Sequence, residues 1–322
     1  MNVLFVEEIS PAQENSLRAL LNRDIHLTVS KEIPAQPDYQ VLVGGRLKPE
    51  MLTASPSLRT VIIPWAGVPV PVREMLIGHP QLTVHNLHYN AQPTAELALT
   101  LLLAAAKNIL PLDSKLREGD WRPRYAASES ILLSGRTAVI LGLGEIGRRV
   151  AEGCRAIGMK TVGIRRRSSA PIESVNQVIP LDQLAEVLPR ANALIVALPL
   201  TGETKGLIGR TELSLLPDRA IVVNVARGPI IQEEALFNEL TSGRLRAGLD
   251  VWYMYPDTLE SRERTEPSAF PFHSLSNVVM TPHVGGDSDQ SDVLWEEGLA
   301  ALLNLAAKGD PLPNRVNLEY GY

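Results

Sequence analysis

The chain has 322 residues, 45% of them hydrophobic, and a formal net charge of −5. This length predicts two domains with separate hydrophobic cores, and the charge excludes the broad basic surface of a nucleic-acid-binding protein. The longest apolar run, Leu97 to Ala106, is too short to span a bilayer, so no membrane association is expected. The single cysteine, Cys154, fits a reducing cytoplasm and a position in a hydrophobic core.

The first ninety residues alternate short β-prone runs with helical stretches. The predicted elements are strands over Val3 to Val6, Ile25 to Val29, Val41 to Val43 and Leu58 to Pro64, and a helix over Pro11 to Asn22. Such alternation predicts a parallel sheet with a binding crevice at the carboxyl ends of its strands. One such end carries Ala66, Gly67 and Val68, whose backbone amides suit a small anion, although a purely structural turn explains this segment equally well.

A long buried helix is predicted to begin at Pro93 or Thr94, because the run that follows is apolar on nearly all sides. A polar connector, Leu116 to Pro123, then leads toward the next domain. Three histidines that lie near each other shortly before this helix lack the paired acids or thiols of a metal site, so we predict no metal. They are His79, His85 and His88.

A strand over Thr137 to Leu141 runs directly into a G-x-G-x-x-G turn, which a helix and a second strand over Thr161 to Ile164 follow. The three glycines of the turn are Gly142, Gly144 and Gly147. Gly142 permits a tight bend, Gly144 lets the backbone approach a pyrophosphate closely, and Gly147 lets the helix pack on the sheet.

The helix that begins with Glu145 and Ile146 offers free N–H groups and a positive dipole end to phosphates. We therefore predict a dinucleotide site. A tight turn without a ligand is the alternative.

The end of the second strand decides which dinucleotide binds. A carboxylate there would accept hydrogen bonds from the ribose hydroxyls, whereas arginine accommodates a 2′-phosphate. No acid is available in this stretch, which reads Arg165, Arg166, Arg167, Ser168 and Ser169. Guanidinium groups give forked hydrogen bonds to phosphate, so we predict NADP, with NAD as the weaker alternative. A solvated basic loop is the explanation that needs no ligand.

Four more strands are predicted at intervals that suit a doubly wound parallel sheet. They cover Ala193 to Leu198, Ile221 to Val225, Ala247 to Val251, and Asn277 to Thr281. Polar residues follow all four, which is hard to ascribe to folding alone. These residues are Pro199 and Thr201, Arg227 and Gly228, Asp250, and Pro282 to Gly286.

From about Asn90 to the C-terminus the chain resembles the D-isomer-specific 2-hydroxyacid dehydrogenase family. The motifs that carry the resemblance are Asn90-Ala91, Thr94 to Ala98, Leu141 to Gly147, Leu198 to Thr204, Asn224 to Gly228, Leu249 to Val251 and Thr281 to Gly286. The resemblance implies a Rossmann-type doubly wound α/β domain, residues 93–287. This domain would be inserted into a smaller flavodoxin-like α/β substrate domain, residues 1–92 and 288–322. It also implies a homodimer.

The resemblance implies roles for individual residues. Arg227 would hold the substrate carboxylate and orient the 2-keto group, and His283 would act as general acid and base. Asp250 would hold the nicotinamide carboxamide. Further cofactor contacts would fall on Leu198, Pro199, Thr204, Val225, Ala226 and Gly285, and the substrate would also meet Ala66, Gly67 and Val68.

Two departures from the family pattern stand out. The family glutamate that pairs with the catalytic histidine is replaced by Tyr255, whose phenol brings no negative charge. The stretch from Asp257 to Pro271 is longer than usual and is expected to be a solvated loop, with the alternative that it lends an acid to His283.

The predicted function is an NADPH-preferring reductase of small 2-keto acids, of the glyoxylate or hydroxypyruvate type. A dinucleotide sensor that has lost catalysis is the alternative, and Tyr255 is its main support.

Overall fold

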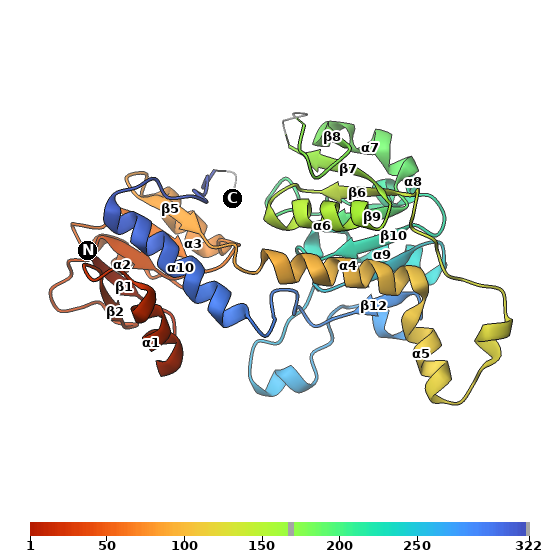
Figure 1. Cartoon of the computed structure of the whole chain (residues 1–322), viewed down its shortest axis with the longest axis horizontal. Helices are drawn as coiled ribbons and strands as arrows, with labels where there is room; N and C mark the ends of the chain where they lie inside the picture. The colour runs from red at the N-terminus through yellow and green to blue at the C-terminus, as the bar shows by residue number, and fades with distance from the viewer. Residues whose placement is uncertain (167–170, 320–322) are drawn as a thin grey trace. The chain divides into compact units, whose positions relative to one another are not determined.

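The computed structural model describes residues 1–166 and 171–319, and within these ranges the chain forms two compact units (Figure 1). The first combines residues 1–90 with the chain from Asp287 onward, and the second runs from Ala91 to Gly286. The expected boundaries after residues 92 and 287 lie two residues and one residue from the observed ones. Arg167 and Ser168, which we expected to contact a 2′-phosphate, lie outside the described residues.

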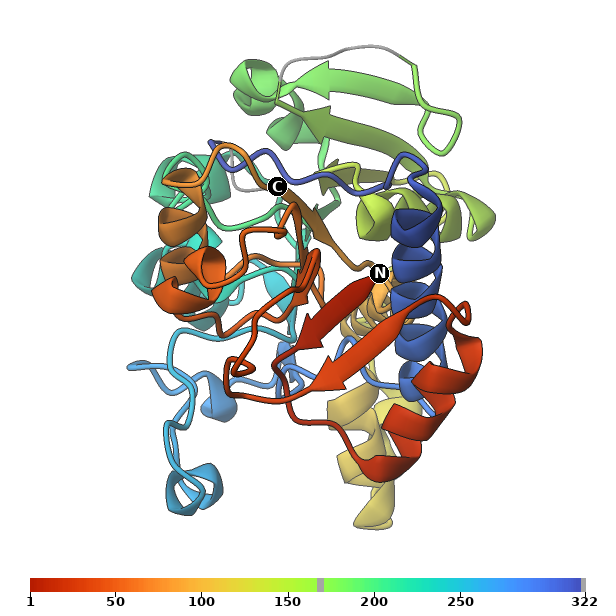
Figure 2. The same ribbon diagram turned by 90° about the vertical axis from the view of Figure 1, so that its left-hand side faces the viewer.

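The first unit contains a five-stranded parallel sheet of order β2-β1-β3-β4-β5. Its strands are β1 (Asn2–Phe5), β2 (His26–Val29), β3 (Val41–Val43), β4 (Thr60–Ile63) and β5 (Thr83–Asn86). Its helices are α1 (Pro11–Leu20), α2 (Pro49–Thr53), α3 (Val70–Ile77) and α10 (Ser291–Lys308). Helices α1 and α10 lie side by side although they come from opposite ends of the chain (Figure 2).

The C-terminal tail packs back on this first unit, as predicted. Arg315 forms an antiparallel bridge with His85 of β5, and the backbone N–H of Val316 donates to the Val84 carbonyl oxygen at 2.8 Å. The side chain of Val316 is buried in the core beside β5. The tail therefore completes the first unit.

The second unit contains a seven-stranded parallel sheet of order β12-β11-β10-β9-β6-β7-β8. Its strands are β6 (Thr137–Leu141), β7 (Lys160–Arg165), β8 (Gln177–Pro180), β9 (Ala193–Val196), β10 (Ile221–Asn224), β11 (Arg246–Leu249) and β12 (Val278–Met280). The strand order reverses between β6 and β9, and ligands of such sheets bind at this switch point. Along β6, Val139 and Leu141 join one core while Ala138 and Ile140 join the other, so both faces are covered.

Helices cover both faces of this sheet (Figure 1). They are α4 (Ala91–Lys107), α5 (Ile109–Arg117), α6 (Glu145–Ala156), α7 (Leu184–Val187), α8 (Arg210–Leu215) and α9 (Glu233–Thr241). Short 3-10 turns are η1 (Arg122–Tyr125), η2 (Leu181–Gln183), η3 (Leu188–Arg190), η4 (Gly228–Ile230), η5 (Glu260–Glu263) and η6 (Phe272–Ser274). Cys154 of α6 is fully buried, as expected, and burial raises the pKa of its thiol to about 12.

Two helix predictions need correction. Helix α4 begins at Ala91 rather than at Pro93 or Thr94. Pro93 is tolerated in the first turn because a backbone N–H at that position would have no partner within the helix. Leu116 and Arg117 belong to α5 and not to a connector. No single helix in the described parts is long and apolar enough to cross a membrane, and the one combination that is, α4 with α5, is bent by 66°.

Candidate active site

The glycine turn after β6 leaves open space beside the start of α6. Gly142 has a φ of +94°, and a Cβ atom on it would lie 2.7 Å from the Ala197 carbonyl oxygen. A Cβ on Gly147 would lie 1.9 Å from the Gly142 carbonyl oxygen, so the fold requires glycine at both positions. At Gly144, in contrast, no described atom outside its two chain neighbours lies within 4 Å of the Cβ position. The backbone at Gly144 is thus open to the close approach of a pyrophosphate.

The N-terminus of α6 points its first N–H groups toward this turn. Gly144 is the N-cap and no side chain caps the helix, so the amides of Glu145 and Ile146 remain available for an anion. The Glu145 carboxylate accepts hydrogen bonds from Arg149, at 2.7 Å, and from Arg148, and the Arg149 bond is the main cause that lowers its pKa. These arginines offset the acid beside the phosphate position, and the turn fits a dinucleotide.

The end of β7 carries the predicted basic residues but also an acid that we did not expect. Arg165 is the last residue of β7, and the guanidinium of Arg166 lies 3.2 Å from the Glu203 carboxylate. Glu203 belongs to the loop after β9. Strands β7 and β9 both flank β6, so their following loops meet at one edge of the sheet. The stretch itself contains no acid, as the sequence shows, but Glu203 supplies one from a neighbouring loop.

Other predicted cofactor residues lie on the loops after β9 and β10. The Thr204 hydroxyl donates to the Pro199 carbonyl oxygen at 2.7 Å, and Leu198 packs against the Gly142 position. Val225 and Ala226 directly follow β10 and are buried. These residues share the carboxyl edge of the sheet with the glycine turn.

Arg227 stands on a loop that the side chain of Asn224 holds in place. Asn224 is only 1% exposed; its Oδ1 accepts from the Ala226 N–H and its Nδ2 donates to the Arg227 carbonyl oxygen, both at 3.1 Å. The Arg227 side chain is exposed, and its guanidinium donates to the Ala226 carbonyl oxygen at 2.7 Å. The role of Asn224 was not predicted, although a polar residue that ends an apolar buried strand is a recognisable signal in the sequence.

Asp250 fixes the loop that carries His283. Its carboxylate is 1% exposed and accepts hydrogen bonds from the Thr281 hydroxyl at 2.7 Å and from the N–H groups of Val284 and Gly285, both at 2.9 Å. A Cβ on Gly285 would lie 2.8 Å from an oxygen of this carboxylate, so the contact requires glycine there. Asp250 is a positioning residue for this loop, and its contact with a nicotinamide carboxamide stays a prediction.

His283 has an unusual backbone conformation. Its φ of +59° lies in the left-handed region, which residues other than glycine enter at a cost of about 1–3 kcal/mol. Histidine is among the residue types that tolerate this region best. Asp250 maintains the conformation by clamping the two residues that follow. Strain of this kind is concentrated at functional sites, and the imidazole is exposed on the carboxyl edge of the sheet.

Tyr255 lies beside His283, with the two ring centroids 5.5 Å apart and the planes tilted by 58°. The Tyr255 hydroxyl accepts a hydrogen bond from the backbone N–H of Trp252 at 3.0 Å. The Trp252 indole in turn donates to the Thr281 carbonyl oxygen at 2.8 Å, which ties the two loops together. Burial raises the pKa of Tyr255 above its usual value, so the phenol is neutral where enzymes normally operate.

Most of the segment from Asp257 to Pro271 is exposed and projects from the second unit (Figures 1 and 2), but Ser268 is buried and Phe270 packs against the core. The Asp257 carboxylate accepts from the Ser261 hydroxyl at 3.2 Å, and the Glu266 carboxylate lies 3.7 Å from Nδ1 of His273. These contacts engage the two acids with residues other than His283. The expectation of a solvated loop is confirmed for residues 257–266, whereas the end of the segment packs on the second unit.

In the first unit, the carbonyl oxygens that lead into the Ala66–Gly67–Val68 loop are all used. Those of Pro64, Trp65 and Ala66 accept hydrogen bonds from the Trp295 indole, the Leu87 N–H and the Asn86 amide, at 3.0, 3.3 and 2.5 Å. No hydrogen bond among the described residues uses the N–H of Gly67 or Val68. The loop therefore offers two free amides, the property expected of an anion-binding turn.

His79, His85 and His88 were predicted to hold no metal, and of these His85 makes a contact within the fold. Nδ1 of His85 lies 2.7 Å from the Pro313 carbonyl oxygen, a contact within the fold. Within residues 1–166 and 171–319, no three His, Cys, Asp or Glu side chains converge as metal ligands would.

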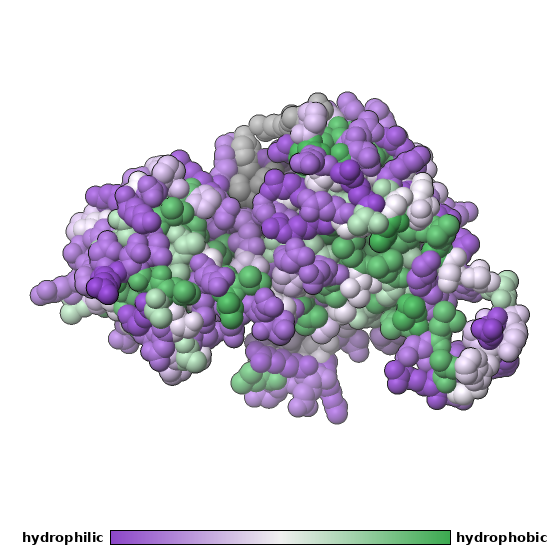
Figure 3. All heavy atoms as spheres, in the orientation of Figure 1, coloured by the Kyte–Doolittle hydropathy of each residue, from purple (hydrophilic) through white to green (hydrophobic). Residues whose placement is uncertain are grey.

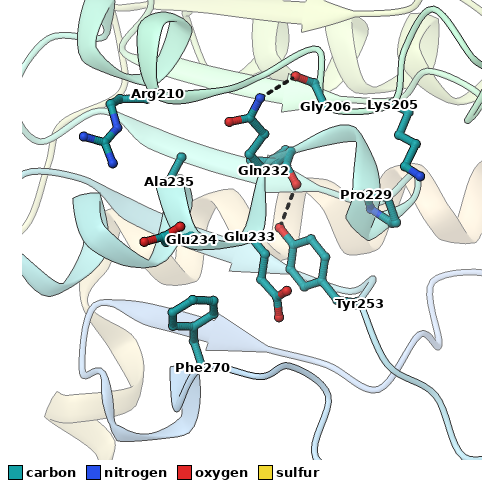
Figure 4. A pocket seen from close by; sticks show the side chains of 11 residues that line it. Lys205, Gly206, Arg210, Pro229, Gln232, Glu233, Glu234, Ala235, Tyr253 and Phe270 are labelled. Atoms are coloured by element: carbon teal, nitrogen blue, oxygen red, sulfur yellow. Dashed lines mark hydrogen bonds between the residues drawn. The ribbon is translucent and has the colours of Figure 1, made fainter.

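A pocket of about 460 Å³ opens in the second unit among residues of the α8 and α9 N-termini, with Tyr253 and Phe270 in its wall (Figure 4). The Tyr253 hydroxyl donates to the Ile231 carbonyl oxygen at 3.0 Å. Arg227, Asp250 and His283 do not line this pocket, so it is distinct from the catalytic candidates.

Comparisons with known proteins agree with this fold. The model of the D-isomer specific 2-hydroxyacid dehydrogenase NAD binding domain matches residues 99–285. A D-3-phosphoglycerate dehydrogenase from Mycobacterium tuberculosis is 34% identical over 296 residues, which cover 90% of this chain and 53% of that protein. A glyoxylate reductase from Thermococcus gammatolerans is 34% identical over 238 residues, 70% of this chain and 66% of that protein. The chain thus spans about half the length of the phosphoglycerate dehydrogenase.

Among solved structures, a D-isomer specific 2-hydroxyacid dehydrogenase from Xanthobacter autotrophicus in complex with NADPH and MES superposes with a TM-score of 0.81 at 24% identity. The match covers 100% of this chain and 99% of that one, and it shows a common fold.

Proposed function

Because the chain belongs to the D-isomer-specific 2-hydroxyacid dehydrogenase family, we propose that it transfers hydride between a nicotinamide dinucleotide and a small 2-keto or D-2-hydroxy acid. The observation that carries this proposal is that Arg227, Tyr255 and His283 are held in place at neighbouring strand ends. Asn224 holds the Arg227 loop, the Trp252 N–H binds the Tyr255 hydroxyl, and Asp250 holds the loop of His283. Arg165 and Arg166 at the end of β7 support NADP(H) as the preferred cofactor, with NAD(H) as the weaker alternative.

In the proposed mechanism, the nicotinamide, Arg227 and His283 have separate roles. When bound, the nicotinamide supplies the hydride in reduction and accepts it in oxidation. Arg227 holds the substrate carboxylate with two parallel hydrogen bonds and so orients the carbonyl. His283 gives a proton to the carbonyl oxygen in reduction and takes it back in oxidation. Within the first unit, the free amides of Gly67 and Val68 are suited to bind a small anion.

We expect the substrate to be a compact keto acid of the glyoxylate or hydroxypyruvate type. The glyoxylate reductase relative supports this class. We also propose a cytoplasmic location, which the single, fully buried thiol of Cys154 favours.

The experiment that tests the function measures loss of NADPH absorbance when the purified chain meets glyoxylate, hydroxypyruvate and pyruvate in turn. We expect turnover of at least one of them, and a higher kcat/KM with NADPH than with NADH. Oxidation of the matching D-hydroxy acids with NADP⁺ is followed in parallel. Binding of NADPH without turnover in either direction would instead support the dinucleotide sensor, for which Tyr255 beside His283 is the favouring observation.

We further propose that the protein is a homodimer assembled through α5. Ile109, Leu112 and Leu116 share one face of this helix and are between 39% and 52% exposed. Trp121, Tyr125 and Leu132 on the following segment are still more exposed. Hydrophobic residues are visible along this part of the second unit (Figure 3). A second copy of the chain would cover this apolar surface.

Light scattering coupled to size exclusion should give a mass of twice 35.2 kDa for the parent protein. The double change Leu112→Asp and Leu116→Asp should shift it toward the monomer, because it places charges on the buried face of the proposed interface. Leu259→Asp is the matched control, since Leu259 is exposed but lies on the 257–271 loop. A monomeric parent, or a dimer that the α5 variant leaves intact, contradicts this interface.

A further inference from the structure

The acid that approaches the end of β7 comes from the opposite side of the glycine turn. The Glu203 carboxylate is 61% exposed and lies 3.2 Å from the Arg166 guanidinium, whose side chain is only 19% exposed. Arg166 is thus held in place, whereas the head of Glu203 borders solvent. This ion pair lies at the end of the second strand of the dinucleotide-binding unit, where the adenosine ribose of a bound dinucleotide is expected.

The turn that carries Glu203 is rigid. The Thr201 N–H donates to the Thr204 hydroxyl oxygen at 2.8 Å, and the Lys205 N–H donates to the Thr201 carbonyl oxygen at 3.0 Å. Thr204 is buried and donates its own hydroxyl hydrogen to Pro199. The backbone of Glu203 is therefore fixed beside Arg166, and only its side chain can turn away.

A carboxylate at this place acts in opposite directions on the two dinucleotides. The 2′-phosphate of NADP(H) is a dianion that needs Arg166, so Glu203 competes with it for the guanidinium and repels it. The ribose hydroxyls of NAD(H) are donors, and a carboxylate accepts their hydrogen bonds. We propose that Glu203 is a specificity-determining residue that lowers the preference for NADP(H) and permits use of NAD(H). This inference rests on the proposed dinucleotide-dependent function.

The test measures dissociation constants of NADP⁺ and NAD⁺ by calorimetric titration of the full chain. Glu203→Gln keeps the shape of the side chain and removes its charge. We expect Glu203→Gln to bind NADP⁺ about fivefold more tightly than the parent does, and NAD⁺ no more tightly than the parent does. The ratio of NADP⁺ affinity to NAD⁺ affinity should therefore rise at least about fivefold. Glu186→Gln on α7 is the matched control, because Glu186 is exposed and forms no ion pair with a described residue. An unchanged ratio in Glu203→Gln overturns the proposal.

A double-mutant cycle tests whether Glu203 acts through Arg166. In an Arg166→Ala background, Glu203→Gln should tighten NADP⁺ binding by a smaller factor than in the parent, because competition for the guanidinium is absent and only the direct repulsion remains. Equal effects in both backgrounds would overturn the assigned route. If the parent binds neither dinucleotide, the proposed function itself fails. If it binds both and the ratio does not move, only the role of Glu203 fails.

Discussion

Arg227→Lys should lower kcat/KM for the 2-keto acid about a hundredfold while leaving NADP⁺ affinity nearly unchanged. The substitution keeps the positive charge, but an ammonium group cannot form two parallel hydrogen bonds with a carboxylate. One lost hydrogen bond to a charged group costs about 1.5–3 kcal/mol, and the loosened carboxylate also misaligns the carbonyl. The backbone should not shift, because Asn224 holds this loop through main-chain atoms of residues 226 and 227.

Arg210→Lys is the matched control for this change, since Arg210 belongs to the same unit but lines the separate pocket at α8 (Figure 4). Steady-state kinetics should show parent behaviour for the control. The decisive comparison is with the keto acid varied at saturating NADPH. If Arg227→Lys retained the parent kcat/KM, Arg227 would be a structural residue, and the proposed carboxylate anchor would have to be sought elsewhere.

The strands that the sequence predicts best are those with both faces buried. Strands β3 and β6 span the predicted residues, because a continuous apolar run is typical of a parallel strand between two layers of helices. Strands β5 and β8 were not predicted. In β5, His85 and Asn86 are buried polar residues whose contacts with Pro313 and Ala66 only the folded chain reveals. Strand β8 lies at the edge of its sheet and ends in proline, which weakens its signal.

The sequence likewise predicts only part of the candidate site. The rule that parallel strands present ligand-binding residues at their carboxyl ends locates Arg227, Asp250 and His283 at one edge of the sheet. It does not predict which side chains of different loops meet. The approach of Glu203 to Arg166 is a pairing of this kind, and so is the link from Trp252 to Thr281. The left-handed backbone of His283 is likewise invisible in the sequence, because it results from the contacts of Asp250.

Replacing His283 should abolish most of the activity, with kcat for keto-acid reduction falling by about 10²–10⁴-fold, the usual contribution of a positioned general acid. Asparagine is the appropriate substitute, because it tolerates the left-handed backbone at this position better than alanine does. His283→Asn should therefore keep the parent melting temperature and NADP⁺ affinity. Parent-like turnover in this variant would show that the proton comes from another group.

The pH profile of reduction identifies the proton donor more directly. Reduction needs protonated imidazole, so the rate should fall as the pH rises through the pKa of His283. Tyr255 is neutral in this range, because burial raises the pKa of its phenol. Tyr255→Glu places a carboxylate beside the imidazole, which stabilises the protonated form and should move the falling limb upward by about one pH unit. Tyr255→Phe removes the hydroxyl without adding charge and should produce no upward shift. If Tyr255→Glu remained active with an unshifted limb, another acid would control His283, and Asp257 and Glu260 would be the residues to replace next.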